Sequence, residues 1–192
     1  MKRMFCLLLC LLCLCPAALA ENPAEGGMVT YDFDDFTIDV PAEAVVQEAE
    51  KVAGSPFFAV YPFYDAAQAF NDNFNIVWMP QDLSAVFAQM DAASLAQTQL
   101  NTNLAVFSAM GVEVANASVL AAAYDESGDA FSYYVTMDLD YAGAGLDLQY
   151  TLHQVQMYLD LGDEAGYVFS FSAQDAETLE ALIACADTMQ LA

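Results

Sequence analysis

The stretch VANASVLAAAYDESGDAFSYYVTMDLDY, residues 114–141, holds two segments of strand-like pattern on either side of a turn-forming cluster. The cluster is DESGD, residues 125–129, which combines glycine with short polar side chains. A short connection rich in Gly and Asp between two strands is typical of an antiparallel hairpin. The stretch therefore predicts two neighbouring antiparallel strands, Val114–Tyr124 and Ala130–Tyr141.

The same pattern continues toward the C-terminus. Leu146–Leu159 and Tyr167–Ser172 are predicted as two further strands, each preceded by a short Gly-containing connection. Ser172 and Asp175 then match a capping box, which predicts the start of a final helix. The apolar face of that helix consists of Leu179, Leu182, Ile183 and Ala186.

Toward the N-terminus, Asp82–Met110 is the clearest helical region. Ser94 and Gln97 match a second capping box, so the region is predicted as one helix or two, and Gly111 suits the position just after the helix end. One apolar stripe recurs at helical spacing, at Phe87, Met90, Ala93, Ala96, Leu100, Leu104 and Phe107.

Four shorter elements are predicted before this helical region. Phe36–Val40 alternates apolar and polar residues and is predicted as a half-buried strand. Residues 41–54 are predicted as a helix that begins at a proline and ends at a glycine, with Val45, Ala49 and Val52 on one face. Two further strands are expected at Phe57–Phe63, where Pro62 allows only an edge or an end position, and at Asn73–Met79. The order of elements predicts an α+β fold.

The first twenty residues match a cleavable secretory signal peptide. Lys2 and Arg3 precede twelve apolar residues, and the small-x-small sequence ending at Ala20 predicts cleavage before Glu21. Twelve apolar residues are too few to cross a bilayer core, which needs about 20. We therefore expect a signal peptide at 1–20, a short polar tether at 21–30 and a single domain at 31–192. The expected location is extracellular, or periplasmic in a host with an outer membrane, without membrane insertion after cleavage.

Charge is the most unusual feature of the composition. All 27 Asp and Glu residues follow the predicted signal, whereas Lys51 is the only Lys or Arg after Arg3, which gives the processed chain a formal charge of −26. Binding to nucleic acid requires cations that neutralise phosphates, so the charge excludes that class of partner. Such repulsion favours a monomer and a cationic partner, and we expect many carboxyl pKa values to be higher in the folded than in the unfolded state.

Several residues are candidates for a functional site. Solvated turn acids are the simpler interpretation, but calcium prefers several oxygen ligands from one loop. The calcium candidates are Asp125, Glu126, Asp129, Asp160, Asp163 and Glu164. Asp138 and Asp140 share one strand face and are one candidate carboxylate pair for a glycosidase-type hydrolase. His153, the only histidine, is predicted as an exposed strand residue.

The remaining features point to structural roles. Cys185, the only cysteine after the predicted signal, is predicted as a small buried hydrophobic residue. Asn116-Ala117-Ser118 matches a glycosylation sequon, which matters only in a eukaryotic host. No catalytic, metal or cofactor motif is recognisable, so no catalytic residue, metal ligand set or cofactor is assigned.

Four segments carry a family resemblance: FTIDVP at 36–41, FNIVWMP at 74–80, GYVFSFSA at 166–173 and ACADTMQL at 184–191. Together they resemble the PsbP-like superfamily, which includes the oxygen-evolving subunit P of photosystem II, the nuclear import factor that binds Ran, and exported bacterial proteins. The resemblance implies a three-layer α/β/α sandwich with a central, mainly antiparallel sheet. It also implies protein binding without catalysis and offers no catalytic residue to carry over. The chain departs from many relatives at Ala42-Glu43, where they place Gly-Trp or Asn-Trp.

These observations predict a secreted, acidic, non-enzymatic module that binds a cationic protein or peptide. The aromatic-rich segment Phe57–Phe70 and the acidic strand faces are the expected contact surfaces. Three alternatives remain: an extracellular hydrolase that uses a carboxylate pair, a calcium-binding surface protein, and an acidity that reflects the whole proteome and implies no partner. A deep groove with two facing acids and a raised pKa would favour the hydrolase, whereas a flat acidic face would favour binding.

Overall fold

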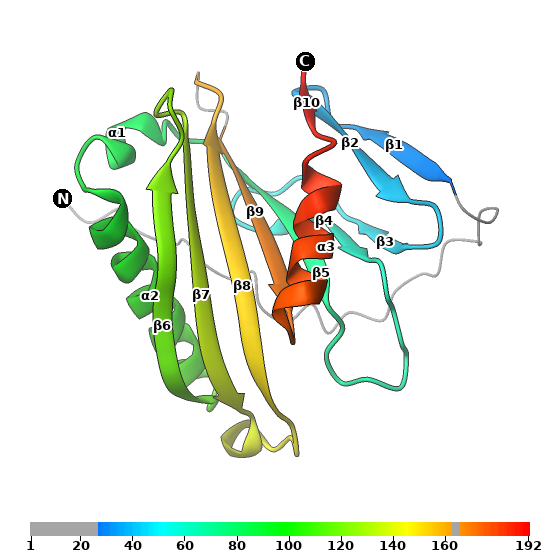
Figure 1. Ribbon diagram of the computed structural model, residues 1–192, viewed down its shortest axis with the longest axis vertical. Helices are drawn as coiled ribbons and strands as arrows, with labels where there is room; N and C mark the ends of the chain where they lie inside the picture. The colour runs from blue at the N-terminus through cyan, green and yellow to red at the C-terminus, as the bar shows by residue number, and fades with distance from the viewer. Residues whose placement is uncertain (1–26, 163–165) are drawn as a thin grey trace.

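The computed structural model describes residues 27–162 and 166–192 and shows an α+β fold with antiparallel strand pairing (Figure 1). The strands are β1 (Met28–Asp32), β2 (Phe36–Pro41), β3 (Val45–Glu48), β4 (Pro56–Tyr61), β5 (Asn73–Met79), β6 (Glu113–Tyr124), β7 (Ala130–Asp140), β8 (Gln149–Asp160), β9 (Gly166–Ala173) and β10 (Gln190–Leu191). The helices are α1 (Ser84–Phe87), α2 (Ala92–Ala109) and α3 (Ala176–Ala186), with a short 3₁₀ helix η1 (Ala142–Ala144). The predicted α+β class with mainly antiparallel sheets is confirmed.

Seven strands form the main sheet in the order β3-β4-β5-β9-β8-β7-β6, and β1-β2-β10 form a second, smaller sheet. The four predicted C-terminal strands are present as β6 to β9, and their pairing is antiparallel throughout. Along β7, buried and half-buried residues alternate without interruption, as the two-residue period of a strand requires. The hairpin prediction from residues 114–141 is therefore confirmed.

Two hydrophobic cores lie on opposite faces of the main sheet. Val168 belongs to the core that includes Leu100 and Phe107 of α2. The next residue, Phe169, belongs to the core that includes Leu182 of α3 and the buried side chains of β2. Successive strand residues point to opposite faces, so α2 covers one face while α3 and the small sheet cover the other (Figure 1).

The prediction of a helix over residues 41–54 is wrong. Residues 45–48 form β3, in which Val45 and Val46 pair with the end of β4. The face proposed for the helix has no core to cover, because Val52 is 50% exposed. The pairing with β4 outweighs the local helical pattern, and β-branched valines suit a strand. In consequence β4 is an internal strand, and Pro62 follows its last residue.

The long helical region is two helices, and both capping assignments are corrected. Helix α2 begins at Asp91, whose carboxylate accepts a hydrogen bond from the Ser94 backbone N–H, so Ser94 is not the cap. Helix α3 likewise begins at Asp175, whereas Ser172 is a buried residue of β9. In both cases an Asp at the cap position satisfies a backbone N–H group three residues later. The buried face of α2 consists of Leu95, Ala96, Gln99, Leu100, Asn103 and Phe107, while Met90 and Ala93 of the predicted stripe are exposed.

The first strand begins at Met28 and pairs with β2, so residues 28–30, which the sequence analysis assigned to the tether, belong to the small sheet. Within residues 27–162 and 166–192, no helix combines the length and the apolar character that a membrane crossing requires. The predicted signal peptide and its cleavage site between Ala20 and Glu21 lie outside the described residues.

Candidate functional site

The α3 side of strands β6 to β8 is a partly open sheet surface. On this side β7 is half-buried, and the corresponding positions of β6 are exposed. Strand register sets two rows of side chains at the end of the sheet where β6 begins. Glu113 lies opposite Asp140, which lies opposite Gln149. In the next row Asp138 lies between Ala115 and Thr151. Three carboxylates therefore come from two adjacent strands.

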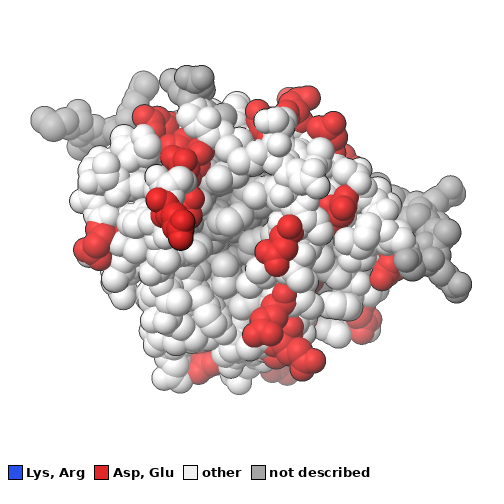
Figure 2. Space-filling model, turned by 45° about the horizontal axis from the view of Figure 1, so that its top comes forward, with Lys and Arg blue, Asp and Glu red and all other residues white. Residues whose placement is uncertain are grey.

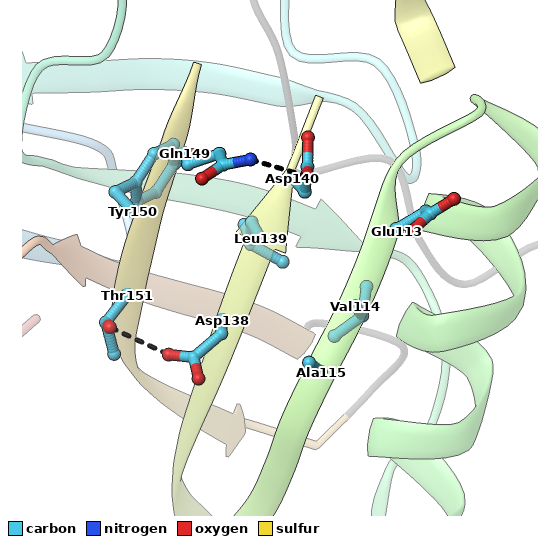
Figure 3. A pocket seen from close by; sticks show the side chains of 9 residues that line it. All are labelled: Glu113, Val114, Ala115, Asp138, Leu139, Asp140, Gln149, Tyr150 and Thr151. Carbon is cyan, nitrogen blue, oxygen red and sulfur yellow. Dashed lines mark hydrogen bonds between the residues drawn. The ribbon is translucent and has the colours of Figure 1, made fainter. Parts of the chain in front are cut away.

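A shallow hollow of about 530 Å³ lies at this end of the sheet (Figure 3). The lining residues come from the paired ends of β6, β7 and β8 and are Glu113, Val114, Ala115, Asp138, Leu139, Asp140, Gln149, Tyr150 and Thr151. Three of the nine are acidic and none is basic. We call this set of residues the acidic hollow.

Neighbouring groups hold two of the three acids of the hollow in place. Asp138 accepts hydrogen bonds from the Asn116 amide and the Thr151 hydroxyl, both at 2.7 Å. These two hydrogen bonds, with that from Asn116 first, hold the pKa of Asp138 below its ordinary value. Asp140 accepts from the Gln149 amide at 2.6 Å and from the Ala142 backbone N–H at 2.8 Å. The hollow thus offers oriented oxygen acceptors to a cationic group.

Asn116 reaches Asp138 because of a bulge that the sequence pattern does not reveal. The pairing of β6 with β7 shifts register between Ala115 and Ser118, and Asn116 has a positive φ of 50°. Asn tolerates this left-handed conformation better than most residues do. The sequence drew attention to Asn116 only as part of a sequon, whereas in the fold its amide orients a carboxylate of the hollow.

His153 lies one row further along the same sheet surface, opposite Thr136. It is half-buried, and its Nδ1 atom lies 2.6 Å from the Tyr134 hydroxyl oxygen. The prediction of an exposed histidine on the polar face is therefore right about the face, but the side chain is partly covered and has an aromatic partner.

The turn acids that were candidates for calcium ligands lie in two places at the opposite end of the sheet. Asp125 accepts hydrogen bonds from the Ser127 hydroxyl and from the backbone of Gly128 and Ala130, so its carboxylate shapes its own turn. The Ser127 hydrogen bond is the main reason that the pKa of Asp125 lies below its ordinary value. Glu126 and Asp129 are exposed in the same turn.

Asp160, the fourth of these candidates, is 8% exposed and accepts hydrogen bonds from the backbone of Ser84 and Gly162. It therefore joins the start of α1 to the end of β8. Asp163 and Glu164 lie outside the described residues. Across the part of the chain that the structure describes, no group of three His, Cys, Asp or Glu side chains has a metal-binding arrangement. A calcium site at these turns stays a prediction.

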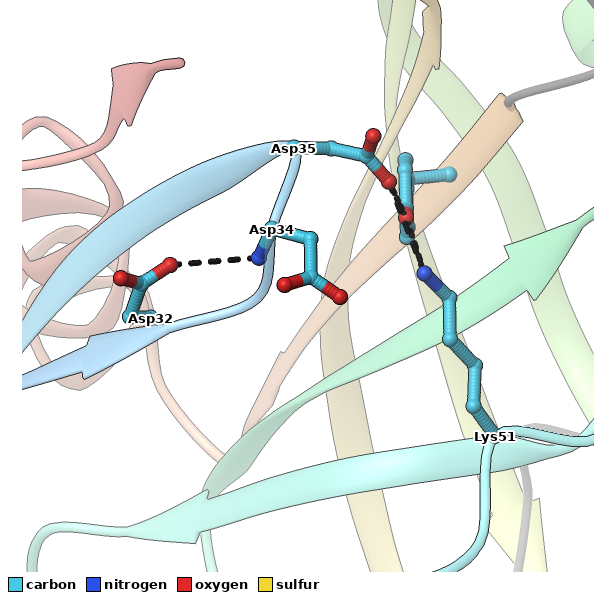
Figure 4. Close-up of polar contacts among 5 residues, drawn as sticks. Asp32, Asp34, Asp35 and Lys51 are labelled. Carbon is cyan, nitrogen blue, oxygen red and sulfur yellow. Dashed lines mark hydrogen bonds and ion pairs between the residues drawn. The ribbon is translucent and has the colours of Figure 1, made fainter.

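Asp35, in the connection between β1 and β2, pairs with Lys51 and does not line the hollow. Lys51 forms an ion pair with Asp35, with Nζ 3.5 Å from Oδ2, and donates a hydrogen bond to the Tyr167 hydroxyl at 2.5 Å (Figure 4). The Tyr167 hydroxyl in turn donates to Asp35. Burial and the Asp35 carboxylate raise the pKa of Tyr167 above its ordinary value. The single cation of the predicted mature chain is thus engaged within the fold, away from the acidic hollow.

The aromatic-rich segment divides into core and surface. Phe57 and Phe58 are buried, whereas Phe63 and Tyr64 are 61% and 41% exposed in the loop that follows β4. Phe70, at the end of the segment, stacks on Tyr150 of β8 with ring centroids 4.8 Å apart. This stack packs on the core beneath α2, on the opposite face of the sheet from Asp138 and Asp140, and it joins residues eighty positions apart that no local pattern connects.

Cys185 is buried on α3, as predicted. Burial raises the pKa of its thiol, which reduces the fraction of reactive thiolate near neutral pH.

Comparisons with known proteins agree on the fold. No protein-family model and no curated protein matches the chain. Among solved structures, the Ran-binding protein Mog1p of Saccharomyces cerevisiae is similar with a TM-score of 0.52 and 12% identity, covering 86% of this chain and 95% of Mog1p. Cyanobacterial PsbP (CyanoP) from Synechocystis sp. PCC 6803 is similar with a TM-score of 0.56 and 11% identity, covering 92% of this chain and 100% of CyanoP. The chain therefore has the PsbP/Mog1-like fold, as the resemblance in its sequence implied.

Proposed function

We propose that this chain is a secreted, non-enzymatic binding module, built as a three-layer α/β/α sandwich, and that its partner is a cationic protein or peptide bound at the acidic hollow. The observation that carries the proposal is the hollow itself, where Glu113, Asp138 and Asp140 meet on two paired strands. Two of these carboxylates are oriented by side-chain donors before any partner arrives. Such preorganisation lowers the entropic cost of binding a Lys or Arg side chain.

The chemistry of the hollow favours binding over hydrolysis. A glycosidase needs one carboxyl group with a raised pKa that donates a proton to the leaving group. The pKa of Asp138 is shifted in the opposite direction by Asn116 and Thr151, so this carboxyl stays ionised. The hollow is also shallow and open, which suits the contact surface of a macromolecule.

The fold gives a second line of support. Mog1p, which shares the fold, is a Ran-binding protein by its name. A protein partner is therefore compatible with this architecture, although the shared fold carries no information about which partner this chain binds. Secretion and a monomeric state rest on the sequence of residues 1–20 and on the charge. The intact mass of the protein from culture medium tests the former, with Glu21 expected as the first residue.

A charge-matched pair of variants tests the binding site. The hollow variant carries Glu113→Gln, Asp138→Asn and Asp140→Asn, and the control variant carries Glu43→Gln, Glu48→Gln and Glu50→Gln, three exposed acids on and beside β3. Binding to a synthetic oligolysine peptide and to proteins of the producing organism's surface fraction is measured for both. We expect the hollow variant to lose about tenfold or more in affinity and the control variant to lose much less. Equal losses would mean that only net charge matters, and the proposed site would be abandoned.

A further inference from the structure

The ammonium group of Lys51 lies within a cluster of aromatic rings that borders the α3-side core. Its Nζ atom is 4.9 Å from the ring centroid of Tyr167, 5.4 Å from that of Trp78 and 5.8 Å from that of Phe57. The Asp35 Oδ2 atom lies 3.5 Å from the same nitrogen (Figure 4). Aromatic rings that surround a cation are the means by which many proteins bind ammonium ligands. We call Asp35, Phe57, Trp78 and Tyr167 the cation cage.

Contacts within the main sheet position the aromatic rings of the cage. Trp78 of β5 lies opposite Tyr167 of β9 in the strand register. Phe57 is the extra residue where the pairing of β4 with β5 shifts register, so it joins the same core as its neighbour Phe58. The Phe57 and Tyr167 rings then pack edge-on, with centroids 6.3 Å apart. These contacts do not involve Lys51, so the rings are in place for any ammonium group that enters.

Lys51 enters the cage from an exposed loop, residues 49–55. The Ala49 and Gly54 backbone N–H groups tie the two ends of this loop to carbonyl oxygens of β4 and β5, at 2.8 and 2.9 Å. Between these ties the Lys51 side chain is 36% exposed and Val52 is 50% exposed. A ligand that arrives from solvent can therefore reach the cage along the path that the lysine side chain takes.

The hydrogen bonds of the cage select a primary ammonium group. The Tyr167 hydroxyl donates its hydrogen to Asp35, so its oxygen accepts the hydrogen bond from the Lys51 Nζ atom at 2.5 Å. An ammonium group that replaces Lys51 must supply an N–H donor to this oxygen. The side chain of a lysine has three such donors, whereas a quaternary ammonium group has none. The cage therefore suits a lysine side chain better than a quaternary amine.

We propose that the cation cage is a binding site for a lysine side chain of a partner protein, and that Lys51 is an internal competitor that the partner lysine displaces. The site goes beyond the proposed function, because its four residues differ from the nine that line the acidic hollow. Charge favours the exchange: Asp32 and Asp34 lie beside Asp35 in the chain, so one lysine faces three acids (Figure 4). The described surface on the face drawn in Figure 2 likewise shows acidic side chains and no basic one.

The internal competitor sets a threshold for binding. A group tethered by a short segment of chain competes at an effective concentration in the millimolar range. A single free lysine therefore displaces Lys51 poorly. A protein with several lysines, or one held by further contacts, displaces it at a much lower concentration.

The fluorescence of Trp78, the only tryptophan of the chain, reports directly on the cage. The variant Lys51→Ala is titrated with n-butylammonium chloride, which resembles a lysine side chain, and with tetramethylammonium chloride and sodium chloride at matched ionic strength. We expect a saturable change with n-butylammonium, weaker binding of tetramethylammonium and no saturable change with sodium. The unmodified protein should need about tenfold more n-butylammonium, because Lys51 competes. If n-butylammonium acts on Lys51→Ala no differently from sodium, the cage is not an ammonium site.

A charge-matched pair of variants controls this titration. Adding Asp35→Asn to Lys51→Ala should abolish n-butylammonium binding, whereas adding Glu50→Gln, which removes an exposed acid next to residue 51, should preserve it. Equal losses in both would mean that net charge alone attracts the amine, and the inference would be wrong. Because Lys51→Ala lowers stability, a rise of its unfolding temperature with n-butylammonium is a second readout.

Displacement of Lys51 is tested on the unmodified protein. Lys51 is the only lysine after Arg3, so an isotope label on lysine side chains gives one NMR signal in the processed chain. We expect a synthetic oligolysine peptide to move this signal toward that of a free lysine. If the peptide binds and the signal stays where it was, Lys51 is a fixed part of the fold and the inference is overturned.

The hollow variant separates this site from the proposed function. Combined with Lys51→Ala, it should bind n-butylammonium as tightly as Lys51→Ala alone, because the two sites share no residue. Binding lost in this combination would place the amine at the hollow and overturn the inference, while the proposed function would stand.

Discussion

Lys51 shows how one residue organises its surroundings in this acidic chain. Its ammonium group lies 4.9 Å from the ring centroid of Tyr167, 5.4 Å from that of Trp78 and 5.8 Å from that of Phe57. It also pairs with Asp35 in the connection between β1 and β2. Since Tyr167 and Trp78 belong to the main sheet, this single cation ties the small sheet to the large one. A lysine is suited to the position because its charge binds the carboxylate while its stem packs on aromatic rings.

Replacing Lys51 with methionine should lower the free energy of unfolding by about 1–2 kcal/mol, because an apolar chain of similar length keeps the packing and loses the charge-assisted contacts. The expected loss of stability is small because the Lys51 and Asp35 side chains are 36% and 38% exposed, so water screens their attraction. Urea unfolding measures it. Glu50→Gln, at the exposed neighbouring residue, is the control and should be neutral or slightly stabilising. If both variants unfold at the same urea concentration as the unmodified protein, the pairing contributes nothing to stability.

Two turns support the acidic hollow at the scale of secondary structure. Gly111 ends the α2 region with a φ of +78°, and Gly143 lies in η1 between β7 and β8. A Cβ atom at Gly143 would lie 2.3 Å from the Gly111 carbonyl oxygen, closer than real Cβ atoms approach other atoms. The start of β6 and the β7–β8 connection can therefore meet only because residue 143 has no side chain. This contact fixes the ends of the strands that carry Glu113 and Asp140.

Gly143→Ala should accordingly destabilise the protein by about 2–3 kcal/mol, the upper part of the usual range for a single substitution, because two backbone segments must separate. Thermal unfolding followed by circular dichroism measures the effect. Gly27→Ala is the matched control, since nothing lies within 4 Å of a Cβ at that position. Weaker peptide binding by folded Gly143→Ala protein would link this turn to the geometry of the hollow. An unfolding temperature equal to that of the control would show that the two turns are not in the contact described.

Over the whole molecule, local partners modify the effect of the large negative charge. The expectation that many carboxyl pKa values are raised on folding holds for Asp72, whose pKa is raised by burial first and then by the nearby Asp175. It is wrong for five others, whose pKa values are lowered by hydrogen bonds from hydroxyl, amide or backbone N–H groups: Asp82, Asp91, Asp125, Asp138 and Asp175. Most of these acids sit at turns or helix starts, where unpaired N–H groups are available.

These shifts predict acid sensitivity. A carboxyl with a lowered pKa in the folded state stabilises the protein above its unfolded-state pKa of about 4, and that stabilisation is lost as the pH falls through the folded-state value. Asp72 has the opposite sign, but it is one group against five. The unfolding temperature should therefore fall between about pH 5 and pH 3. Asp125→Asn should make this decline shallower than the exposed control Glu126→Gln does. A temperature that rises throughout this range would mean that general repulsion outweighs the local hydrogen bonds.

Salt separates general repulsion from specific cation binding. At neutral pH, sodium chloride should raise the unfolding temperature, because about 0.15 M salt screens charges more than roughly 8 Å apart. Diffuse repulsion predicts the same gain from calcium chloride at matched ionic strength. A larger gain from calcium that disappears in Asp129→Asn would support a calcium site at the turn formed by Asp125, Glu126 and Asp129. No gain from either salt would remove the argument that charge selects a cationic partner.

One part of the candidate site can be predicted from the sequence, and another part depends on how the strands pair. That Asp138 and Asp140 share a strand face follows from the two-residue period of β7, which the alternation within residues 130–141 made readable. That Glu113 joins them depends on the register between β6 and β7, and that Asn116 orients Asp138 depends on a bulge in the same pairing. Register and bulges are set by contacts across strands, so no pattern along one strand contains them.

By itself, the sequence determined the features that depend on near neighbours: the four hairpin strands, the helical region before them, the buried Cys185 and the charge of the chain. Only the tertiary structure decided the features that depend on distant partners. Residues 45–48 form a strand because β4 offers them an edge, although their own spacing favours a helix. Lys51 has partners within the fold because Asp35 and Tyr167 contact it from two other parts of the chain. Phe70 stacks on Tyr150, eighty residues away in the sequence. Local propensities amount to less than about 1 kcal/mol per residue, so strand pairing and core packing override them wherever the two disagree.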